Sequence, residues 1–556
     1  MKHISVILTL ILCIYNVNAQ NSIPQETSID SIFSDWNKPE TPGGALGIIK
    51  DGKLIYAKGY GAANLEYNIP NSPQSVFRIA STSKQFTAAC IVLLSQQGKL
   101  SLGDKLIKFF PDFPAYANNI TIQHLLNHTS GIRDYLSLAS LSGLEDEDHY
   151  TDKTVMKWLA NQEELNFKPG DEYLYSNSGY WLLGQIVNKV SGVSMAKYAK
   201  ENIFDPLGMD NTHFHNDHTQ IVKNRASGYS PSKQKGYSIS MTTLDMIGDG
   251  GVFTTVEDLK KWDDNFYDSK ILNQDFWNKM TTVGTLNNGE QITYASGLGI
   301  DTYKGLKTIQ HGGAFVGYRA EMIRLPEQRF TVILLANRSD ANPTRMAFQV
   351  ADIFLKDEFK ENDNAATDSN FTKENIKSIS LSKDQLSAFE GTYWNNDDKI
   401  SRKLEVRNDT LHYVRSNGRT TKMIPIAKDT FQWFISNPTI ILKFDDSGSP
   451  KNFSLDIPGE TLSNFRAYMP MDSFTDNDLK TYSGDYYNRD LDVVYTFKTE
   501  GKGMALYING ELADPIIPIM KNALTLAPFM IFEFNETNDA CILSVGRVKN
   551  LKFVKK

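Results

Sequence analysis

The residues best suited to chemistry are a serine and a lysine three positions apart. Ser81 and Lys84 are the first and last residues of the sequence S-T-S-K. On a helix this spacing puts both side chains on one face. A largely apolar run precedes them, and an apolar helical pattern follows as far as Gly98. Such a helix is buried, and burial shifts a lysine amine towards the neutral form that can accept a proton. The sequence therefore predicts Ser81 as a nucleophile and Lys84 as a group able to serve as its base.

The same S-x-x-K spacing occurs at other positions in the chain, and its context separates the copies. The other copies start at Ser194, Ser230, Ser232 and Ser380. Two of these lie in a polar loop that contains proline, one adjoins a polar stretch, and one opens an amphipathic helix with no second catalytic component nearby. Only Ser81 leads a long apolar helix, which favours it as the nucleophile.

Two further motifs offer groups that could assist a serine nucleophile. Tyr175 begins a Y-S-N sequence in which a Pro-Gly turn delivers a short strand into a helix. His311 begins the sequence H-G-G-A, directly before a strand. Glycine leaves room for a close backbone approach, so Gly313 is expected to let a substrate backbone lie against the strand edge.

Together these segments resemble the class C β-lactamases and penicillin-binding-protein-like serine hydrolases. That family includes D-alanyl-D-alanine carboxypeptidases, D-aminopeptidases and esterases. The resemblance covers about residues 26–360 and extends to L-L-N-H-T-S-G at residues 125–131 and to Gly250-Gly251 ahead of Thr254-Thr255. It implies a β-lactamase/transpeptidase-like fold.

The resemblance also implies a role for each site residue. Ser81 is the nucleophile, and Lys84 and Tyr175 move the proton as a coupled pair whose division of labour stays open. Asn177 binds the substrate amide, and the backbone amides of Ser81 and Ala314 form the oxyanion hole. No cofactor is implied.

His311 stands where β-lactamases and carboxypeptidases of this family usually carry a lysine. Histidine is common at that place in the esterase and aminopeptidase branches. An unperturbed histidine titrates near pH 6.5, so at neutral pH it is mostly uncharged. We therefore expect weak selection for carboxylate-terminated peptides, weakening further as pH rises through the His311 pKa, and inefficient β-lactam hydrolysis.

The elements that must position these residues indicate one α+β domain over residues 26–360. Two β-prone runs, residues 44–49 and 54–60, flank a K-D-G-K turn of the hairpin type. Two more runs, residues 318–325 and 330–337, follow a helix-rich middle. Strands at both ends of the segment are expected to close one antiparallel sheet.

The chain beyond this domain contains a polar linker and an internal repeat. Residues 361–380 are predicted to be the linker, so that ending the chain near Glu361 should leave a folded catalytic domain. Four positions recur at one offset: Leu386, Phe389, Gly391 and Tyr393 return as Leu479, Tyr482, Gly484 and Tyr486. Each copy, residues 381–472 and 473–556, is expected to be an all-β barrel-like unit, with two barrels favoured over two halves of one.

Composition and the first residues indicate where the chain acts and which partners it lacks. A net charge of -7 without a basic cluster argues against a nucleic-acid-binding surface. Residues 1–19 have the charged, apolar and small-residue order of a signal peptide, so we expect export to the periplasm or secretion and no membrane span. Cys90 and Cys541 are too far apart to predict a disulfide framework.

Two histidine features have simpler explanations than catalysis. His213, His215 and His218 fall within six residues but lack a carboxylate or cysteine at ligand spacing, so no metal site is predicted. His128 is interpreted as a residue that stabilises a turn.

These observations favour a serine hydrolase that acts on a short D-amino-acid peptide or a small acyl ester through an acyl-enzyme on Ser81. Its partners would be that small peptide or ester, including peptidoglycan fragments. One alternative is a non-catalytic cell-envelope or peptidoglycan-binding protein that retains a vestigial pocket. A second alternative is a β-lactamase. Ser81, Lys84 and Tyr175 together argue against the binding protein, which needs none of them.

Overall fold

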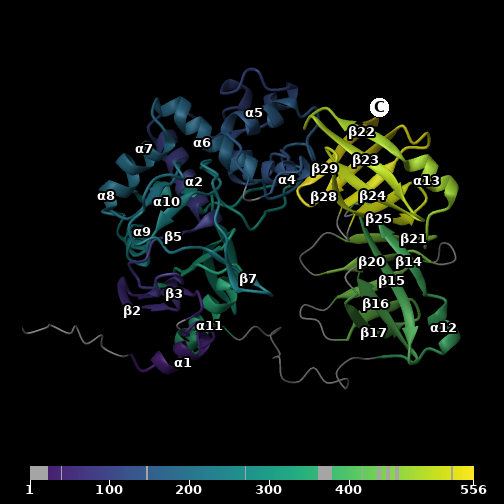
Figure 1. Ribbon diagram of the computed structural model, residues 1–556. Coiled ribbons are helices and arrows are strands. Elements are labelled where there is room, and N and C mark those ends of the chain that lie inside the picture. The colour runs from purple at the N-terminus through teal and green to yellow at the C-terminus, as the bar shows by residue number, and fades with distance from the viewer. Residues whose placement is uncertain are drawn as a thin grey trace, which may run out of the picture.

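The computed structural model describes residues 23–38, 40–145, 148–269, 271–360, 378–397, 399–415, 418–434, 440–445, 451–457, 462–526 and 530–556. The predicted signal peptide and most of the predicted linker lie outside the described residues. Figure 1 shows an N-terminal body of sheet and helices beside two stacked β-barrels. No helix among the described residues has both the length and the apolar character needed to span a bilayer.

The N-terminal body is built on a six-stranded antiparallel sheet with the order β10-β11-β12-β13-β1-β2. Its strands are β1 (Gly44–Lys50), β2 (Lys53–Tyr60), β10 (Gly299–Tyr303), β11 (Leu306–Phe315), β12 (Tyr318–Leu325) and β13 (Phe330–Ala336). The first strand pairs with the last, Gly44 opposite Ala336, which confirms that distant segments close the sheet. Asp51 and Gly52 both have positive φ, as the predicted β1–β2 turn requires.

Helices cover both faces of this sheet. One face packs on α1 (Glu26–Ile32) and α11 (Pro343–Leu355) in a core that includes Leu46 and Ile48. The other face meets the larger helical core. That core contains α2 (Lys84–Gln96), α3 (Ile122–Leu126), α4 (Tyr135–Leu141), α5 (Asp152–Asn161), α6 (Asn177–Ser191), α7 (Met195–Ala199), α9 (Val256–Asp268) and α10 (Gln274–Thr281). The α+β architecture predicted from the sequence is confirmed.

Short elements connect these helices and strands. They are the helical turns η1 (Ala80–Ser83), η2 (Leu106–Lys108), η3 (Ala115–Asn118), η4 (Lys200–Phe204) and α8 (Asp205–Leu207), and the strands β3 (Ala62–Asn64), β4 (Ile69–Pro70), β5 (Phe77–Arg78), β6 (His213–Phe214), β7 (Tyr229–Ser232), β8 (Gly236–Ile239) and β9 (Val252–Thr254). Strand β9 pairs with both β5 and β6, and so holds the segment before Ser81 against the segment after α8.

The C-terminal repeats form two closed eight-stranded barrels, which confirms the preferred arrangement. The first contains β14 (Gly391–Asn395), β15 (Ile400–Arg407), β16 (Thr410–Arg415), β17 (Thr420–Ala427), β18 (Thr430–Trp433), β19 (Ile441–Phe444), β20 (Phe453–Asp456) and β21 (Ser463–Tyr468), after α12 (Lys383–Ser387). The second contains β22 (Gly484–Asn488), β23 (Val493–Glu500), β24 (Gly503–Ile508), β25 (Glu511–Met520), β26 (Ala523–Leu526), β27 (Met530–Phe534), β28 (Ala540–Val545) and β29 (Val548–Lys555), after α13 (Asp476–Tyr482).

The second barrel shares a core with the N-terminal body, whereas the first has a core of its own. Arg133, which is buried, donates hydrogen bonds to the backbone oxygens of Lys549 and Asn550, each at 3.0 Å. The Tyr495 hydroxyl donates to the Leu141 carbonyl at 2.8 Å. Removing the barrel would expose apolar and polar groups that are now covered. The second barrel and the N-terminal body therefore stabilise each other, and folding of residues 26–360 on their own stays a prediction.

Candidate active site

The predicted nucleophile sits in a tight helical turn rather than in the first turn of the long helix. The turn η1 contains Ser81, and α2 begins at Lys84. Ala80 has a φ of 46°, a left-handed conformation that is uncommon for a residue with a side chain. The turn brings the Lys84 Nζ to 3.3 Å from the Ser81 Oγ. The two residues therefore lie on one face, as their spacing predicts.

Lys84 is fully buried, and its amine is held by three oxygens. Besides Ser81, the Nζ donates to the Asn177 Oδ1 at 2.8 Å and to the Asp249 carbonyl at 2.6 Å. Burial lowers the pKa of Lys84 to about 8, although the nearby carboxylates of Asp249 and Asp134 oppose that shift. A substantial fraction of the amine is therefore neutral at mildly alkaline pH.

Tyr175 is a further predicted site residue in contact with Ser81 and Lys84. Its hydroxyl is hydrogen-bonded to Ser81, and its ring centre lies 4.8 Å from the Lys84 Nζ. Burial raises the pKa of Tyr175 well above its usual value, while the Ser81 hydrogen bond and the guanidinium of Arg547 oppose that rise. The phenol is therefore protonated at neutral pH. Of the two side chains, Lys84 has the pKa closer to neutrality.

His128 holds the tyrosine segment in place. Its Nδ1 accepts a hydrogen bond from the Ser176 amide at 3.1 Å, and its carbonyl accepts one from the Leu174 amide at 3.0 Å. The rings of His128 and Tyr175 lie 4.1 Å apart. Burial lowers the pKa of His128 well below its usual value, so the ring is neutral. His128 thus has a wider structural role than stabilising its own turn.

Strand β11 brings the third motif against the nucleophile turn. The Thr82 Oγ1 donates to the His311 carbonyl at 3.1 Å. A Cβ on Gly313 would lie 2.1 Å from the Ile79 carbonyl oxygen. The glycine therefore accommodates the protein's own backbone, not only that of a substrate. Pairing of β10 with β11 ends at Gln310. The part of β11 that contains Ala314 is therefore not paired with β10.

His311 is neutral, and both of its ring nitrogens are engaged. The Nδ1 lies 2.6 Å from the Gly312 carbonyl, and the Nε2 lies 2.8 Å from the Tyr294 hydroxyl. A carbonyl can only accept, so the Nδ1 carries the proton and the Nε2 accepts from Tyr294. Burial, with a smaller effect from the Lys84 charge, lowers the pKa of His311 to about 4. The expectation that His311 titrates near neutral pH is wrong.

These residues surround a cavity of about 450 Å³. Six of the seven predicted site residues line it: Ser81, Tyr175, Asn177, His311, Gly313 and Ala314. Lys84 lies beneath them, fully buried. The structure assembles the site at the meeting point of α2, the start of α6 and β11.

Sequence reasoning missed several charged groups at this site, three of which contact the predicted residues or their neighbours. Asp134 accepts a hydrogen bond from the Asn177 amide at 2.7 Å, and Asp249 accepts one from the Tyr135 hydroxyl at 3.0 Å. Arg547 comes from the β28–β29 hairpin of the second barrel, with its guanidinium 4.6 Å from the centre of the Tyr175 ring. The Gly-rich segment around Asp249 was a visible signal. No local motif marked Arg547.

Comparison with protein families identifies the class to which this fold and site belong. The family model described as Beta-lactamase matches residues 29–353, more than half of the chain. The chain therefore belongs to the beta-lactamase family of serine hydrolases. The resemblance stated from the motifs is confirmed.

Among curated proteins, the chain is 27% identical over 305 residues to the D-aminopeptidase of Gluconobacter oxydans, covering 54% of this chain and 56% of that protein. It is 30% identical over 329 residues to Penicillin-binding protein 4* of Bacillus subtilis, covering 56% of this chain and 72% of that protein. The matched segment thus spans little more than half the length of the D-aminopeptidase.

Solved structures extend the similarity beyond the catalytic body. The octameric penicillin-binding protein homologue from Pyrococcus abyssi has a TM-score of 0.54 and 27% identity, and the match covers 79% of this chain and 99% of that one. The D-amino acid amidase from Ochrobactrum anthropi has a TM-score of 0.51 and 22% identity, covering 60% of this chain and 99% of that one. The second likeness shows the fold alone.

Proposed function

We propose that this protein hydrolyses an amide or ester bond in a short D-amino-acid peptide or a related small acyl compound, through an acyl-enzyme on Ser81. The observation that carries the proposal is the contact set around Ser81. Its Oγ lies 3.3 Å from a buried lysine amine and is hydrogen-bonded to Tyr175, at the wall of a cavity of about 450 Å³. A nucleophile next to a base that is itself oriented is the arrangement acyl transfer requires.

The proton path follows from the two pKa shifts. Neutral Lys84 accepts the Ser81 proton as the Oγ attacks the substrate carbonyl, since its pKa near 8 is closer to neutrality than that of Tyr175. The Tyr175 phenol then donates to the leaving group and is reprotonated from Lys84. In the second half-reaction neutral Lys84 takes a proton from a water molecule as the water oxygen attacks the acyl carbonyl. The ester bond to Ser81 then breaks, and the Ser81 oxygen receives that proton back from Lys84. The amides of Ser81 and Ala314 would stabilise the oxyanion in both steps.

The relatives narrow the substrate class. Several of them are named D-aminopeptidases, and a solved structure of the same fold is a D-amino acid amidase. We propose that this chain shares their preference for a D-configured residue at the scissile bond. The predicted signal peptide would place this activity in the periplasm or outside the cell.

A covalent trapping experiment tests the acyl-enzyme. Wild-type protein treated with a fluorophosphonate should gain one adduct by intact-mass analysis, and peptide mapping should place it on Ser81. Ser81→Ala should lose the adduct and turnover while keeping its unfolding transition. Ser232→Ala, on strand β7 and outside the residues that line the cavity, is the matched control and should behave as wild type. Adduct formation by Ser81→Ala would refute the proposal.

The substrate class needs a separate test. D- and L-alanine p-nitroanilides, p-nitrophenyl acetate and a chromogenic cephalosporin should be compared by kcat/KM. A D-over-L ratio above about 10 would support the proposal, since it corresponds to about 1.4 kcal/mol of transition-state discrimination. A higher kcat/KM for the cephalosporin would favour the β-lactamase alternative. Turnover of none of them by a protein that forms no adduct would favour the envelope-binding alternative.

A further inference from the structure

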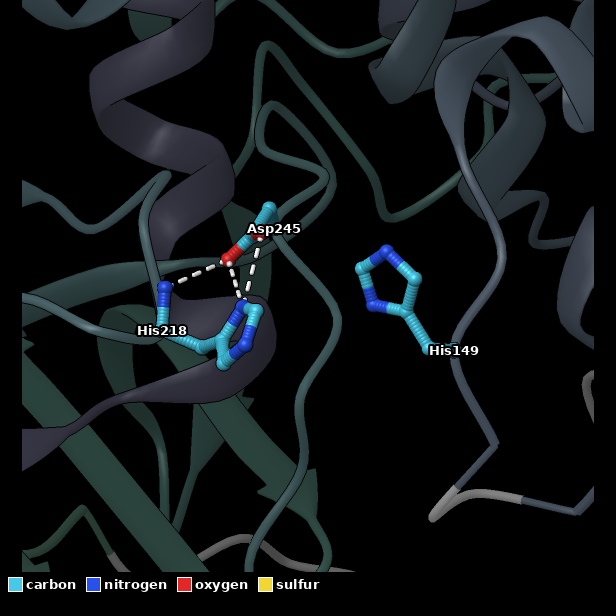
Figure 2. Close-up of side chains that lie close together, drawn as sticks. All are labelled: His149, His218 and Asp245. Carbon is cyan, nitrogen blue, oxygen red and sulfur yellow. Dashed lines mark hydrogen bonds and ion pairs between the residues drawn. The ribbon is translucent and has the colours of Figure 1, made fainter.

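Three loops bring His149, His218 and Asp245 together outside the active-site cavity (Figure 2). One ligating atom from each side chain lies within 4.8 Å of the other two. A second cavity, of about 200 Å³, is lined by His149 and Asp245. We propose that these three side chains form a binding site for a divalent transition metal, and that Zn²⁺ is the ion that fits it best.

His149 is oriented as a metal ligand would be. Its Nδ1 lies 3.0 Å from the carbonyl oxygen of Thr243. A carbonyl can only accept, so the Nδ1 carries the hydrogen and the Nε2 keeps its lone pair. Histidines that bind metals usually donate their other ring hydrogen to a carbonyl or carboxylate in this way. Figure 2 shows the His149 ring extending from its own loop towards the other two side chains.

His218 and Asp245 are already arranged at nearly the required separation. The His218 Nδ1 lies 3.1 and 2.9 Å from the two carboxylate oxygens of Asp245. The His218 backbone amide also donates to the Asp245 Oδ1 at 2.6 Å and so fixes the carboxylate. Tetrahedral zinc with bonds of about 2.0–2.2 Å separates neighbouring ligand atoms by roughly 3.3 Å. Zn²⁺ would replace the shared proton with little rearrangement of this pair.

The donor set favours zinc over harder ions. Two imidazoles and one carboxylate are nitrogen and oxygen ligands typical of Zn²⁺, and a fourth tetrahedral position remains for water. Calcium and magnesium prefer sites built from oxygen alone. His149 is exposed, so its side chain can move the remaining distance towards the pair.

The site lies next to the wall of the active-site cavity, so a bound metal would affect that wall. Asp245 lies between Leu244 and Met246, and both neighbours line the active-site cavity. His149 belongs to the α4–α5 connection, which is remote from Asp245 in sequence. A metal bound by both would tie the cavity wall to that connection. We infer that the ion stiffens residues 240–250 without touching the reacting atoms.

If no metal binds here, the His149 side chain should not matter to the other two residues. His218 and Asp245 alone would form a partly exposed hydrogen-bonded pair, and such surface pairs contribute little to stability. That pair does not need His149, whose hydrogen bond to Thr243 would be a separate loop contact. Removing the His149 ring therefore distinguishes a metal site from an ion pair.

Calorimetric titration of the chelator-treated full chain with ZnCl₂ tests the site. Wild type should bind one Zn²⁺ with a Kd in the micromolar range or below. His149→Ala and Asp245→Asn should each weaken binding at least about 10-fold. His213→Ala is the control, because His213 lies near His218 in sequence but stacks on Phe253 outside the cluster. Millimolar binding by wild type, or His149→Ala binding as wild type does, would overturn the proposal.

A second measurement tests the stiffening and does not depend on hydrolase activity. Hydrogen exchange of residues 240–250 should slow when Zn²⁺ is added to wild type, and should not change for His149→Ala. Equal slowing in both proteins would show that the ion acts elsewhere. No slowing in a wild type that binds Zn²⁺ tightly would refute the link to the cavity wall.

Discussion

The substitution Gly313→Ala tests how the third motif supports catalysis. The new Cβ would lie 2.1 Å from the Ile79 carbonyl oxygen, whereas real Cβ atoms essentially never come within 3.0 Å of another heavy atom. Both partners belong to backbone, one on β11 and one directly before the nucleophile turn. They must therefore separate by about 1 Å, because neither can rotate out of the way.

A displacement of that size acts on the predicted oxyanion hole. Ala314 is the next residue on β11, and its amide is expected to donate to the oxyanion together with the amide of Ser81. Loss of one such donor costs about 10²–10³ in kcat, or about 3–4 kcal/mol. The overpacking itself should lower the free energy of unfolding by about 1–3 kcal/mol. The KM should change little, because the lost interaction forms only in the transition state.

The assay is kcat and KM with a p-nitrophenyl ester, alongside urea unfolding of the same preparation. Gly299→Ala is the matched control, since it lies on the neighbouring strand β10 and its Cβ would meet the Gln310 carbonyl at an ordinary 3.5 Å. That control should keep both activity and stability. A Gly313→Ala protein that is folded and has a wild-type kcat would refute the proposed role of this edge of β11.

Further predictions concern charge. The kcat/KM of wild type should fall as pH drops below about 8, because Lys84 is then protonated and cannot accept the serine proton. Arg547→Met should move that inflection to higher pH, since the guanidinium lowers the Lys84 pKa. His311, with a pKa of about 4, should add no inflection between about pH 5.5 and 8.5, so neutral and carboxylate-bearing substrates should give parallel profiles there. Asp263→Asn should lower the free energy of unfolding by about 3–5 kcal/mol in urea titrations, because it leaves the buried Arg324 without its partner at 2.7 Å.

The sequence predicted those parts of the site that follow from local geometry. A three-residue spacing fixes Ser81 and Lys84 on one face of a helical turn, whatever surrounds them. The helix that carries Asn177 was equally readable, since its apolar period ends at Gly192, which has a φ of 76°. The closed sheet followed from strand runs at both ends of one domain.

Electrostatic details could not be read in the same way. His311 looked like a titrating residue because its sequence neighbours say nothing of Tyr294, which lies 17 positions away and occupies its Nε2. The pKa shift arises from burial, which depends on the packed fold. The same applies to His149 and Asp245, whose separation in sequence hides that they share a site with His218.

The sequence could not predict which of the two barrels packs against the catalytic body. The two repeats are similar in pattern. Among the residues that the structure describes, only the second repeat shares a core with the catalytic body and carries a hairpin that reaches the cavity. Which copy docks depends on how the surfaces fit, and Arg547 lies in a two-residue turn that any barrel hairpin might contain. This guanidinium lowers the pKa of both Lys84 and Tyr175, so the barrel contributes to the electrostatics of the two residues proposed to transfer the proton. A substrate that reaches Ser81 must therefore fit beside a fixed positive charge that the catalytic body does not itself supply.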